Sequence, residues 1–232
     1  MYHFFADRQI GNRLYIDDKD EIHHISKVLR LKVGELVELS FNNYNFLARL
    51  ESFNSSIEFL EIEKKEHKFR RIALIQAIPK SGKLEEILKR STEVGATEIL
   101  LFQGDRSIGK FKKEKLERYK SILKSASKQS KANLVTELKY LNKLEDVTNV
   151  NFDILFICDE NLEEYQRIEN LKGKNIGIII GPEGGFSNRE RQICYENLGC
   201  KPFYLGSRIL RTETAGIKAL SIIDYLEEVN EN

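Results

Sequence analysis

The stretch "IIIGPEGGFSNRE", from Ile178 to Glu190, decides how this chain is interpreted. It opens with three isoleucines, as a strand buried on both faces of a parallel sheet does. Three glycines and a proline follow, and glycine lets the backbone turn tightly and approach a ligand closely. Ser187 and Glu190 have the spacing of a capping box, which predicts a helix that begins there and runs toward Leu198. The stretch therefore predicts a ligand site at the end of a buried strand, lined by backbone and by Glu183; a purely structural turn is the alternative.

Strands alternate with helices on both sides of this stretch. Residues 72–78 and 98–102 have the pattern of strands, and continuous apolar runs typical of buried parallel strands occur at 152–158 and 176–180. Helical spacing of apolar residues occurs at 84–94, in a basic segment that follows, and from about Thr214 to Val229. This alternation predicts an α/β domain with a mostly parallel sheet. Gly216 lies inside the last helix, where glycine is unfavourable, so we expect a close packing contact there.

The N-terminal part of the chain has a different character. Short strand-like runs occupy residues 35–40, 45–51 and 57–63, and one short helix precedes them with Ile22, Ile25, Val28 and Leu29 on one face. Several short strands with little helix indicate a small barrel. We therefore expect two domains, at residues 1–67 and 68–232.

Positive charge is concentrated in the middle of the chain. The net charge is +1, which divides into −3 over residues 1–67, +9 over 68–150 and −5 over 151–232. Within the basic segment, lysines repeat on the face of the predicted helix opposite its apolar stripe: Lys113, Lys120, Lys124, Lys128 and Lys131. The face is either a solvated surface or a stripe that meets a phosphate backbone.

Several classes of protein are disfavoured. The chain contains neither the phosphate-binding pattern of Walker-type nucleotide sites nor the G-x-G-x-x-G of dinucleotide sites. Its three cysteines and four histidines show no spacing of metal ligands, so we expect no metal. Apolar runs of the length that a membrane span requires are missing, as is a secretion signal. These observations predict a cytoplasmic protein with no membrane partner.

A second unusual stretch is "LGSRILRTETAGIKAL", from Leu205 to Leu220. Gly206 follows the short apolar run "PFYL", for which we expect a strand. Arg208 and Arg211 precede the last helix, and ion pairing of both with Glu213 is the plain alternative to a functional role.

Together the two stretches resemble the SPOUT methyltransferases. More narrowly, "IGPEGGFS" followed by "LGSRILRTETA" is similar to the family that methylates N3 of a uridine in bacterial small-subunit ribosomal RNA. "HHISKVLRLKVGE" (23–35) resembles that family's PUA-like N-terminal domain, and "QAIPKSGKLEEILKRSTEVGATEI" (76–99) and "GDRS" (104–107) resemble segments of its catalytic domain. The chain departs from the family at Ala132 and Thr136, where the family has an arginine and a proline.

The resemblance implies a SPOUT α/β domain with a C-terminal trefoil knot, preceded by a small PUA-like β-barrel. It implies S-adenosylmethionine as cofactor and a homodimer in which the partner completes each site. The residues expected to bind the cofactor, largely through their backbone, are Ile180, Gly181, Pro182, Glu183, Gly184, Leu205, Gly206, Ile209, Leu210, Thr212 and Ala215.

The resemblance also implies a division of roles. Arg211 would stabilise negative charge on the uracil, Glu183 would act as base or positioning group, and Thr214 would bind the base or the helix start. The residues expected to bind small-subunit ribosomal RNA, or its assembly particle, are Arg8, Arg30, Lys32, Arg106, Lys113, Lys120, Lys124 and Lys128. Two alternatives remain: a ribose 2′-O-methyltransferase on the same scaffold, and a non-catalytic RNA-binding assembly factor.

Overall fold

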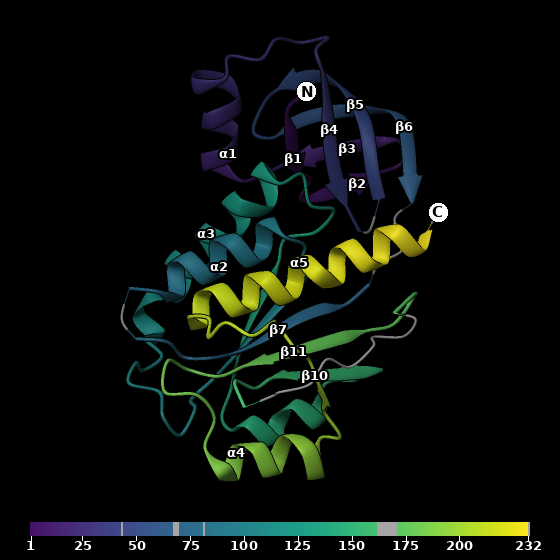
Figure 1. Ribbon diagram of the computed structural model, residues 1–232. Helices are drawn as coiled ribbons and strands as arrows, with labels where there is room; N and C mark the ends of the chain where they lie inside the picture. The colour runs from purple at the N-terminus through teal and green to yellow at the C-terminus, as the bar shows by residue number, and fades with distance from the viewer. Residues whose placement is uncertain (43, 67–69, 81, 162–170, 232) are drawn as a thin grey trace. The chain divides into compact units, whose positions relative to one another are not determined.

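The structure is a computed structural model that describes residues 1–42, 44–66, 70–80, 82–161 and 171–231 (Figure 1). They fall into two compact units. The first unit comprises Met1–Phe69 and Ser127–Val135, and the second comprises Arg70–Ala126 and Thr136–Asn232. The expected boundary between residues 67 and 68 lies outside the described residues. The division at 1–67 and 68–232 stays a prediction, and residues 127–135 group with the first unit.

The first unit is built on a curled six-stranded sheet of order β1-β4-β5-β6-β3-β2, antiparallel except for the β1–β4 pair. Its strands are β1 (His3–Phe5), β2 (Arg8–Ile10), β3 (Arg13–Ile16), β4 (Leu36–Phe41), β5 (Tyr44–Phe53) and β6 (Ile57–Glu66). Alternate residues such as Leu14, Val37 and Phe59 point into one apolar core, which gives these strands their period of two. The three strand-like runs are confirmed.

One short helical segment accompanies this sheet. It consists of α1 (Lys19–His23), capped by the side chain of Asp18, and a π-helical turn η1 (His24–Val28). Ile25 is buried, as expected, but Val28 is 61% exposed. The expectation for Val28 was wrong because the π-helical turn has a wider residue spacing than the α-helix assumed.

The second unit contains a fully parallel sheet of order β12-β10-β11-β7-β8-β9. Its strands are β7 (Ile72–Ala77), β8 (Glu98–Phe102), β9 (Glu137–Leu141), β10 (Ile154–Cys158), β11 (Ile176–Ile180) and β12 (Lys201–Pro202). All residues of β7, β8 and β11 are buried, which explains why these sequences are apolar except at Gln76 and Glu98. The α/β prediction is confirmed, whereas the strand expected over "PFYL" is confined to Lys201–Pro202.

Helices cover both faces of this sheet (Figure 1). One face packs against α2 (Leu84–Glu93), α3 (Leu116–Gln129) and α5 (Thr212–Glu231), through residues such as Leu88, Leu123 and Leu220. The other face packs against η3 (Leu144–Asn149), α4 (Asn188–Gln192) and η4 (Ile193–Asn197). A short 3₁₀ turn, η2 (Lys113–Lys115), precedes α3. The expected helix from Ser187 toward Leu198 is thus α4 continued by a π-helical turn.

The last helix, α5, packs closely on the sheet at Gly216. A Cβ atom at this position would lie 3.2 Å from Cδ1 of Leu74 in β7. The expected close contact is therefore present. It brings the start of α5 to the carboxyl ends of β7 and β11. The connections that leave these two strands run in opposite directions along the sheet, to β8 and to β12, and ligands of open α/β sheets bind at such a point.

Candidate active site

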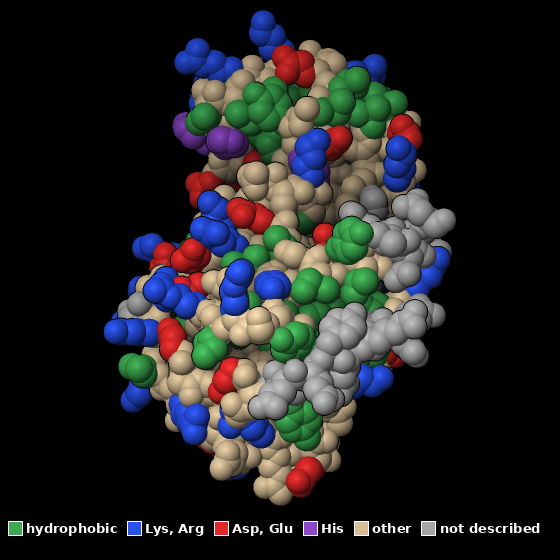
Figure 2. All heavy atoms as spheres, in the orientation of Figure 1, with side chains coloured by type: hydrophobic (Ala, Val, Ile, Leu, Met, Phe, Trp, Pro, Cys, Tyr) green, Lys and Arg blue, Asp and Glu red, His purple; other side chains and the backbone are tan. Residues whose placement is uncertain are grey.

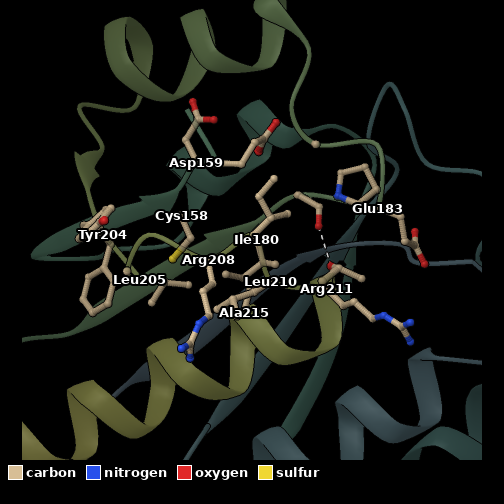
Figure 3. Close-up of a pocket in the computed structure, with 18 of the residues that line it drawn as sticks. Cys158, Asp159, Ile180, Glu183, Tyr204, Leu205, Arg208, Leu210, Arg211 and Ala215 are labelled. Carbon is tan, nitrogen blue, oxygen red and sulfur yellow. Dashed lines mark hydrogen bonds between the residues drawn. The ribbon is translucent and has the colours of Figure 1, made fainter. Parts of the chain in front are cut away.

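A cavity of about 480 Å³ lies at the carboxyl ends of β10 and β11 (Figure 3). Its size is within the range of about 300–1,000 Å³ that small-molecule sites have. All eleven residues predicted to bind the cofactor line it. The structure therefore brings both motifs, about twenty residues apart in sequence, to one concave surface. That these residues bind the cofactor stays a prediction.

The first wall of the cavity is the glycine loop, residues 181–186, which is hydrogen-bonded to the first residue of α5. The Thr212 hydroxyl donates to the carbonyl oxygen of Gly181 at 2.6 Å and accepts from Nε2 of Gln76 at 2.9 Å. A Cβ atom on Gly181 would lie 3.2 Å from the Phe186 ring, so glycine permits this close approach. Gly185 closes the turn, with φ of 66° and its N–H bonded to the carbonyl of Pro182. The glycines thus serve backbone geometry, as the sequence indicated.

Neighbouring loops add polar contacts to this wall. The N–H of Lys80 donates to both carboxylate oxygens of Glu183, at 2.9 and 3.2 Å. Arg106 donates from Nη1 to the carbonyl oxygen of Gly184 at 3.0 Å. Glu183 is therefore engaged by a backbone amide, and Arg106 lies directly against the glycine loop.

The second wall, residues 204–211, is much more open. Residues 206–209 are exposed, and Ile209 is 90% exposed. Nζ of Lys218, from α5, donates to the carbonyl oxygen of Leu205 at 2.6 Å. Gly206 has φ of 101°, a conformation that favours glycine. Residues 204–211 all line the cavity.

An acidic pair at the end of β10 was missed by sequence reasoning. Asp159, 9% exposed, accepts from Arg191 at 2.7 and 3.1 Å, and Glu160 accepts from the same guanidinium at 2.9 Å. The Asp159 bond raises the pKa of Arg191 above its ordinary value. Two carboxylates against one guanidinium leave negative charge beside the cavity, which suits a cationic ligand. The signal was available, because "DE" directly follows a buried parallel strand.

The three predicted catalytic residues are placed differently. Arg211 and Glu183 line the cavity, and Figure 3 shows both side chains extending on the same side of the view. Thr214 is exposed in the first turn of α5 and is not among the residues that line the cavity. Glu213 pairs with Lys83 at 2.7 Å, and this bond, with the nearby charge of Arg211, holds the pKa of Glu213 below its ordinary value.

The predicted RNA-binding residues do not form one uniform surface. Arg30, Lys32, Arg106, Lys113 and Lys120 are exposed, and Lys124 is half-buried. Over the region of α2 and α3, basic side chains are interspersed with acidic ones (Figure 2).

Two of these residues are already engaged in ion pairs within the first unit. Arg8 pairs with Asp17 at 2.8 Å, and Lys128 is half-buried against Glu21. The positions that depart from the family also have partners nearby. Lys131, beside Ala132, pairs with Glu38 at 2.7 Å, and the hydroxyl of Thr136 donates to the carbonyl of Ala96 at 2.7 Å. The role of Lys128 in binding RNA therefore competes with an internal contact.

Two further findings concern the described residues only. None of their helices combines the length and the apolar character that a bilayer crossing demands. They contain no group of three or more His, Cys, Asp or Glu side chains placed to hold a metal ion.

Comparison with known proteins identifies both parts of the chain. Residues 65–224 match the model of an RNA methyltransferase domain, and residues 16–62 match that of an RNA methyltransferase PUA domain. The chain is 31% identical to the ribosomal RNA small subunit methyltransferase E of Bacillus subtilis, covering 90% of this chain and 89% of the relative. It is 32% identical to the protein of the same name from Buchnera aphidicola, over 93% and 89%.

A solved structure supports the same relationship. The ribosomal RNA small subunit methyltransferase E of Neisseria gonorrhoeae, determined bound to S-adenosyl methionine, superposes with a TM-score of 0.81 at 26% identity. The match covers 98% of each chain. The curled first sheet and the parallel second sheet thus occur together in a protein of similar sequence.

Proposed function

The chain belongs to the ribosomal RNA small subunit methyltransferase E family, and from this premise we propose that it methylates N3 of a uridine in 16S ribosomal RNA. The methyl donor is S-adenosylmethionine, which supplies an electrophilic methyl group on a sulfonium. The observation that carries the proposal is the cavity at the ends of β10 and β11, to which both motifs contribute all eleven expected residues.

The cavity suits this donor in size and in charge. Backbone groups of the glycine loop and of residues 205–210 would hold the adenosine part, since these segments offer backbone close to the cavity. Asp159 and Glu160 place negative charge on the side of the end of β10, where a cationic group of the donor would be favoured.

The reaction at N3 requires that the uracil lose a proton and that the resulting anion be stabilised. Arg211 carries a permanent positive charge at the cavity, so we assign it to the uracil carbonyl oxygens. Glu183 is the candidate base, yet both of its oxygens accept the N–H of Lys80, which favours the alternative role of positioning group. Thr214 would act at the start of α5 rather than on the cavity wall.

Substrate binding would involve both units. The PUA-like first unit and the basic residues of α3 would contact RNA phosphates, and the target uridine would be unstacked to reach the cavity. We also propose a homodimer and a cytoplasmic location, both of which follow from the family and from the nature of the substrate.

The test is methylation of small ribosomal subunits that lack the modification. Purified protein would be incubated with these subunits and a donor that carries a deuterated methyl group, and the nucleosides would then be separated by mass spectrometry. We expect deuterated N3-methyluridine. A deuterated ribose-methylated nucleoside would support the 2′-O alternative. Binding of RNA without donor binding or methylation would support the assembly factor.

A further inference from the structure

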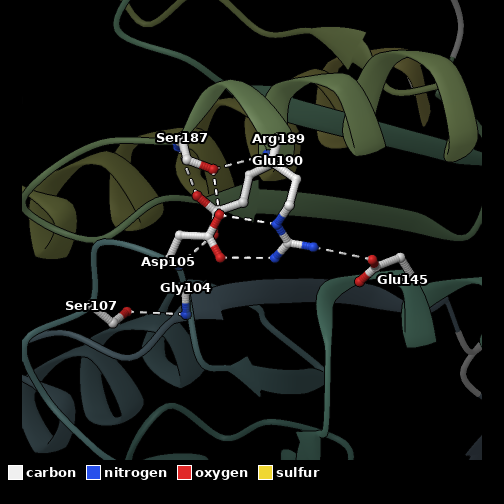
Figure 4. Close-up of polar contacts among 7 residues, drawn as sticks. All are labelled: Gly104, Asp105, Ser107, Glu145, Ser187, Arg189 and Glu190. Atoms are coloured by element: carbon white, nitrogen blue, oxygen red, sulfur yellow. Dashed lines mark hydrogen bonds and ion pairs between the residues drawn. The ribbon is translucent and has the colours of Figure 1, made fainter.

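A group of polar contacts next to the cavity joins two segments that are about eighty residues apart (Figure 4). One segment is the loop 104–107, which carries Arg106. The other is the start of α4, which directly follows the glycine loop. The contacts lie within the second unit, and none of the roles proposed above for the donor or the uracil depends on them.

The central residue of this group is Glu190, which is 1% exposed. Its Oε2 accepts the N–H of Ser187 at 2.8 Å, while the Ser187 hydroxyl accepts the N–H of Glu190 at 3.1 Å. This is the capping box that the sequence predicted. The other carboxylate oxygen of Glu190, Oε1, accepts the N–H of Asp105 at 2.9 Å, and this contact is not part of the capping box. One buried carboxylate therefore connects the helix start to the loop.

A second connection runs through the side chain of Asp105. Its carboxylate accepts from Nη2 and Nε of Arg189, at 2.8 and 3.2 Å, and from the Ser187 hydroxyl at 2.5 Å. The Arg189 bonds, followed by the Ser187 bond, hold the pKa of Asp105 below its ordinary value. Arg189 also reaches Glu145, at a longer 3.4 Å. The loop is thus bonded to α4 through both its backbone and its side chain.

These contacts determine where Arg106 lies. Its neighbours in sequence are both engaged, because Asp105 bonds to α4 and Ser107 bonds to Gly104 through backbone and hydroxyl. Arg106 consequently lies against Gly184, where an added Cβ would come within 3.1 Å of the arginine's own Cβ. The contact with the Gly184 carbonyl uses one of the five donors of the guanidinium. The exposed guanidinium can therefore bind an anion as well.

We propose that Glu190 and Asp105 are positioning residues that hold Arg106 beside the cavity, where it binds a phosphate of the nucleotide being methylated. The proposal rests on the function proposed above. A guanidinium suits phosphate because its planar donors can form two parallel hydrogen bonds. Because Arg106 is held in place before RNA arrives, its contact serves alignment of the uridine with the methyl donor, whereas contacts from surface lysines to phosphates add affinity.

Glu190→Gln separates this role from helix capping. Glutamine serves a capping box as well as glutamate does, since that role needs one acceptor oxygen. It cannot accept on both sides, so its amide nitrogen would face the N–H of Asp105 and the loop would move. A displacement of about 1 Å can cost roughly 100-fold in rate. We therefore expect kcat at saturating RNA to fall roughly 100-fold, with donor affinity and the salt dependence of RNA binding retained.

A double-mutant cycle with Arg106→Ala tests whether Glu190 acts through Arg106. If it does, each single variant lowers kcat strongly and the double variant is less than about threefold slower than the slower single variant, because groups that act as a unit are not additive. Losses in kcat that multiply in the double variant would overturn the proposal. So would a Glu190→Gln enzyme with the wild-type kcat. Absence of methylation by the wild-type protein would instead count against the proposed function.

Asp105→Asn provides a second variant that disturbs no deeply buried carboxylate. Glu145→Gln is its matched control, because it removes the other carboxylate partner of Arg189 while leaving the bonds of the loop in place. We expect Asp105→Asn to lower kcat at least tenfold more than Glu145→Gln. Equal effects of the two variants would mean that Arg189 merely stabilises the fold, and would overturn the proposal.

Discussion

The two walls of the cavity are both built around glycines, but they are held in different ways. The glycine loop, residues 181–186, is bonded to α5 through Gly181 and Thr212, to Lys80 through Glu183, and to Arg106 through Gly184. The wall formed by residues 204–211 is mostly exposed, and its carbonyl at Leu205 accepts from Lys218. One wall thus has its geometry set by several other segments, whereas the other lies largely at the surface.

The difference indicates a division of labour. A wall held by several segments can define where the methyl donor lies, because its atoms cannot shift without breaking hydrogen bonds, of which the one from Thr212 to Gly181 is buried. An exposed wall can adjust around a ligand, and it also carries Arg208 and Arg211, which line the cavity. Changes to the first wall should therefore alter the whole site, and changes to the second should act locally.

The largest effect is expected from Arg211→Ala. Loss of a group that stabilises developing charge typically lowers the rate by about 10²–10³. Donor affinity, measured by calorimetry, should change little, because Arg211 is assigned to the uracil. Arg208→Ala is the comparison on the same wall and should lower turnover less than about tenfold. If Arg211→Ala turned over at nearly the wild-type rate, Arg211 would not be the residue that stabilises the charge on the uracil.

Gly109→Ala tests the loops that are bonded to the first wall, the glycine loop. A Cβ at Gly109 would lie 2.0 Å from the carbonyl oxygen of Pro79, so the loop that carries Arg106 must move away from the loop that carries Lys80. Overpacking of this kind costs about 1–3 kcal/mol. We expect a lower melting temperature together with a lower kcat. Unchanged values for both would show that these loops are less constrained than their contacts indicate.

Gly206→Ala is the matching change on the exposed wall. The nearest atom to an added Cβ is Nζ of Lys218 at 3.5 Å, so the cost comes from the backbone, whose φ of 101° disfavours alanine. A strain of about 1 kcal/mol is expected. Donor affinity should fall several-fold with little loss of thermal stability. A loss of stability as large as that of Gly109→Ala would contradict the contrast between the walls.

The smallest effect on catalysis is expected from Lys120→Gln combined with Lys124→Gln. These residues belong to neither wall, so donor affinity and kcat should be retained. RNA affinity should fall and its dependence on salt should become shallower, since fewer counterions are released. Lys128 is left unchanged because it is half-buried against Glu21. Superimposable salt series for the variant and the wild type would identify this surface as a solvated face.

Sequence reasoning found the features that depend on local pattern. A short stretch of sequence is enough to recognise the buried strands, the turn glycines and the capping box of Ser187 and Glu190. It missed β1, β2 and β3, which are only three or four residues long, and β9, an edge strand with mostly exposed residues. Runs so short or so polar carry too little periodicity to be recognised.

The contacts that sequence reasoning missed are those between distant segments. The pairing of Lys128 with Glu21 joins residues 107 apart, and the bond from Asp105 to Glu190 joins residues 85 apart. Periodicity tells which face of an element is buried but not which other segment covers it. The predicted lysine face (Lys113, Lys120, Lys124, Lys128 and Lys131) was consequently treated as one surface, although Lys128 and Lys131 pair with Glu21 and Glu38 within the first unit.

Hydrogen exchange with and without S-adenosylmethionine tests the contrast between the walls most directly, because exchange reports how readily each segment opens. We predict that residues 181–187 are already protected without the donor and change little when it is added. Residues 204–211 should exchange rapidly without the donor and gain strong protection with it. Fast exchange of the glycine loop without the donor, or protection gained only there, would contradict the account.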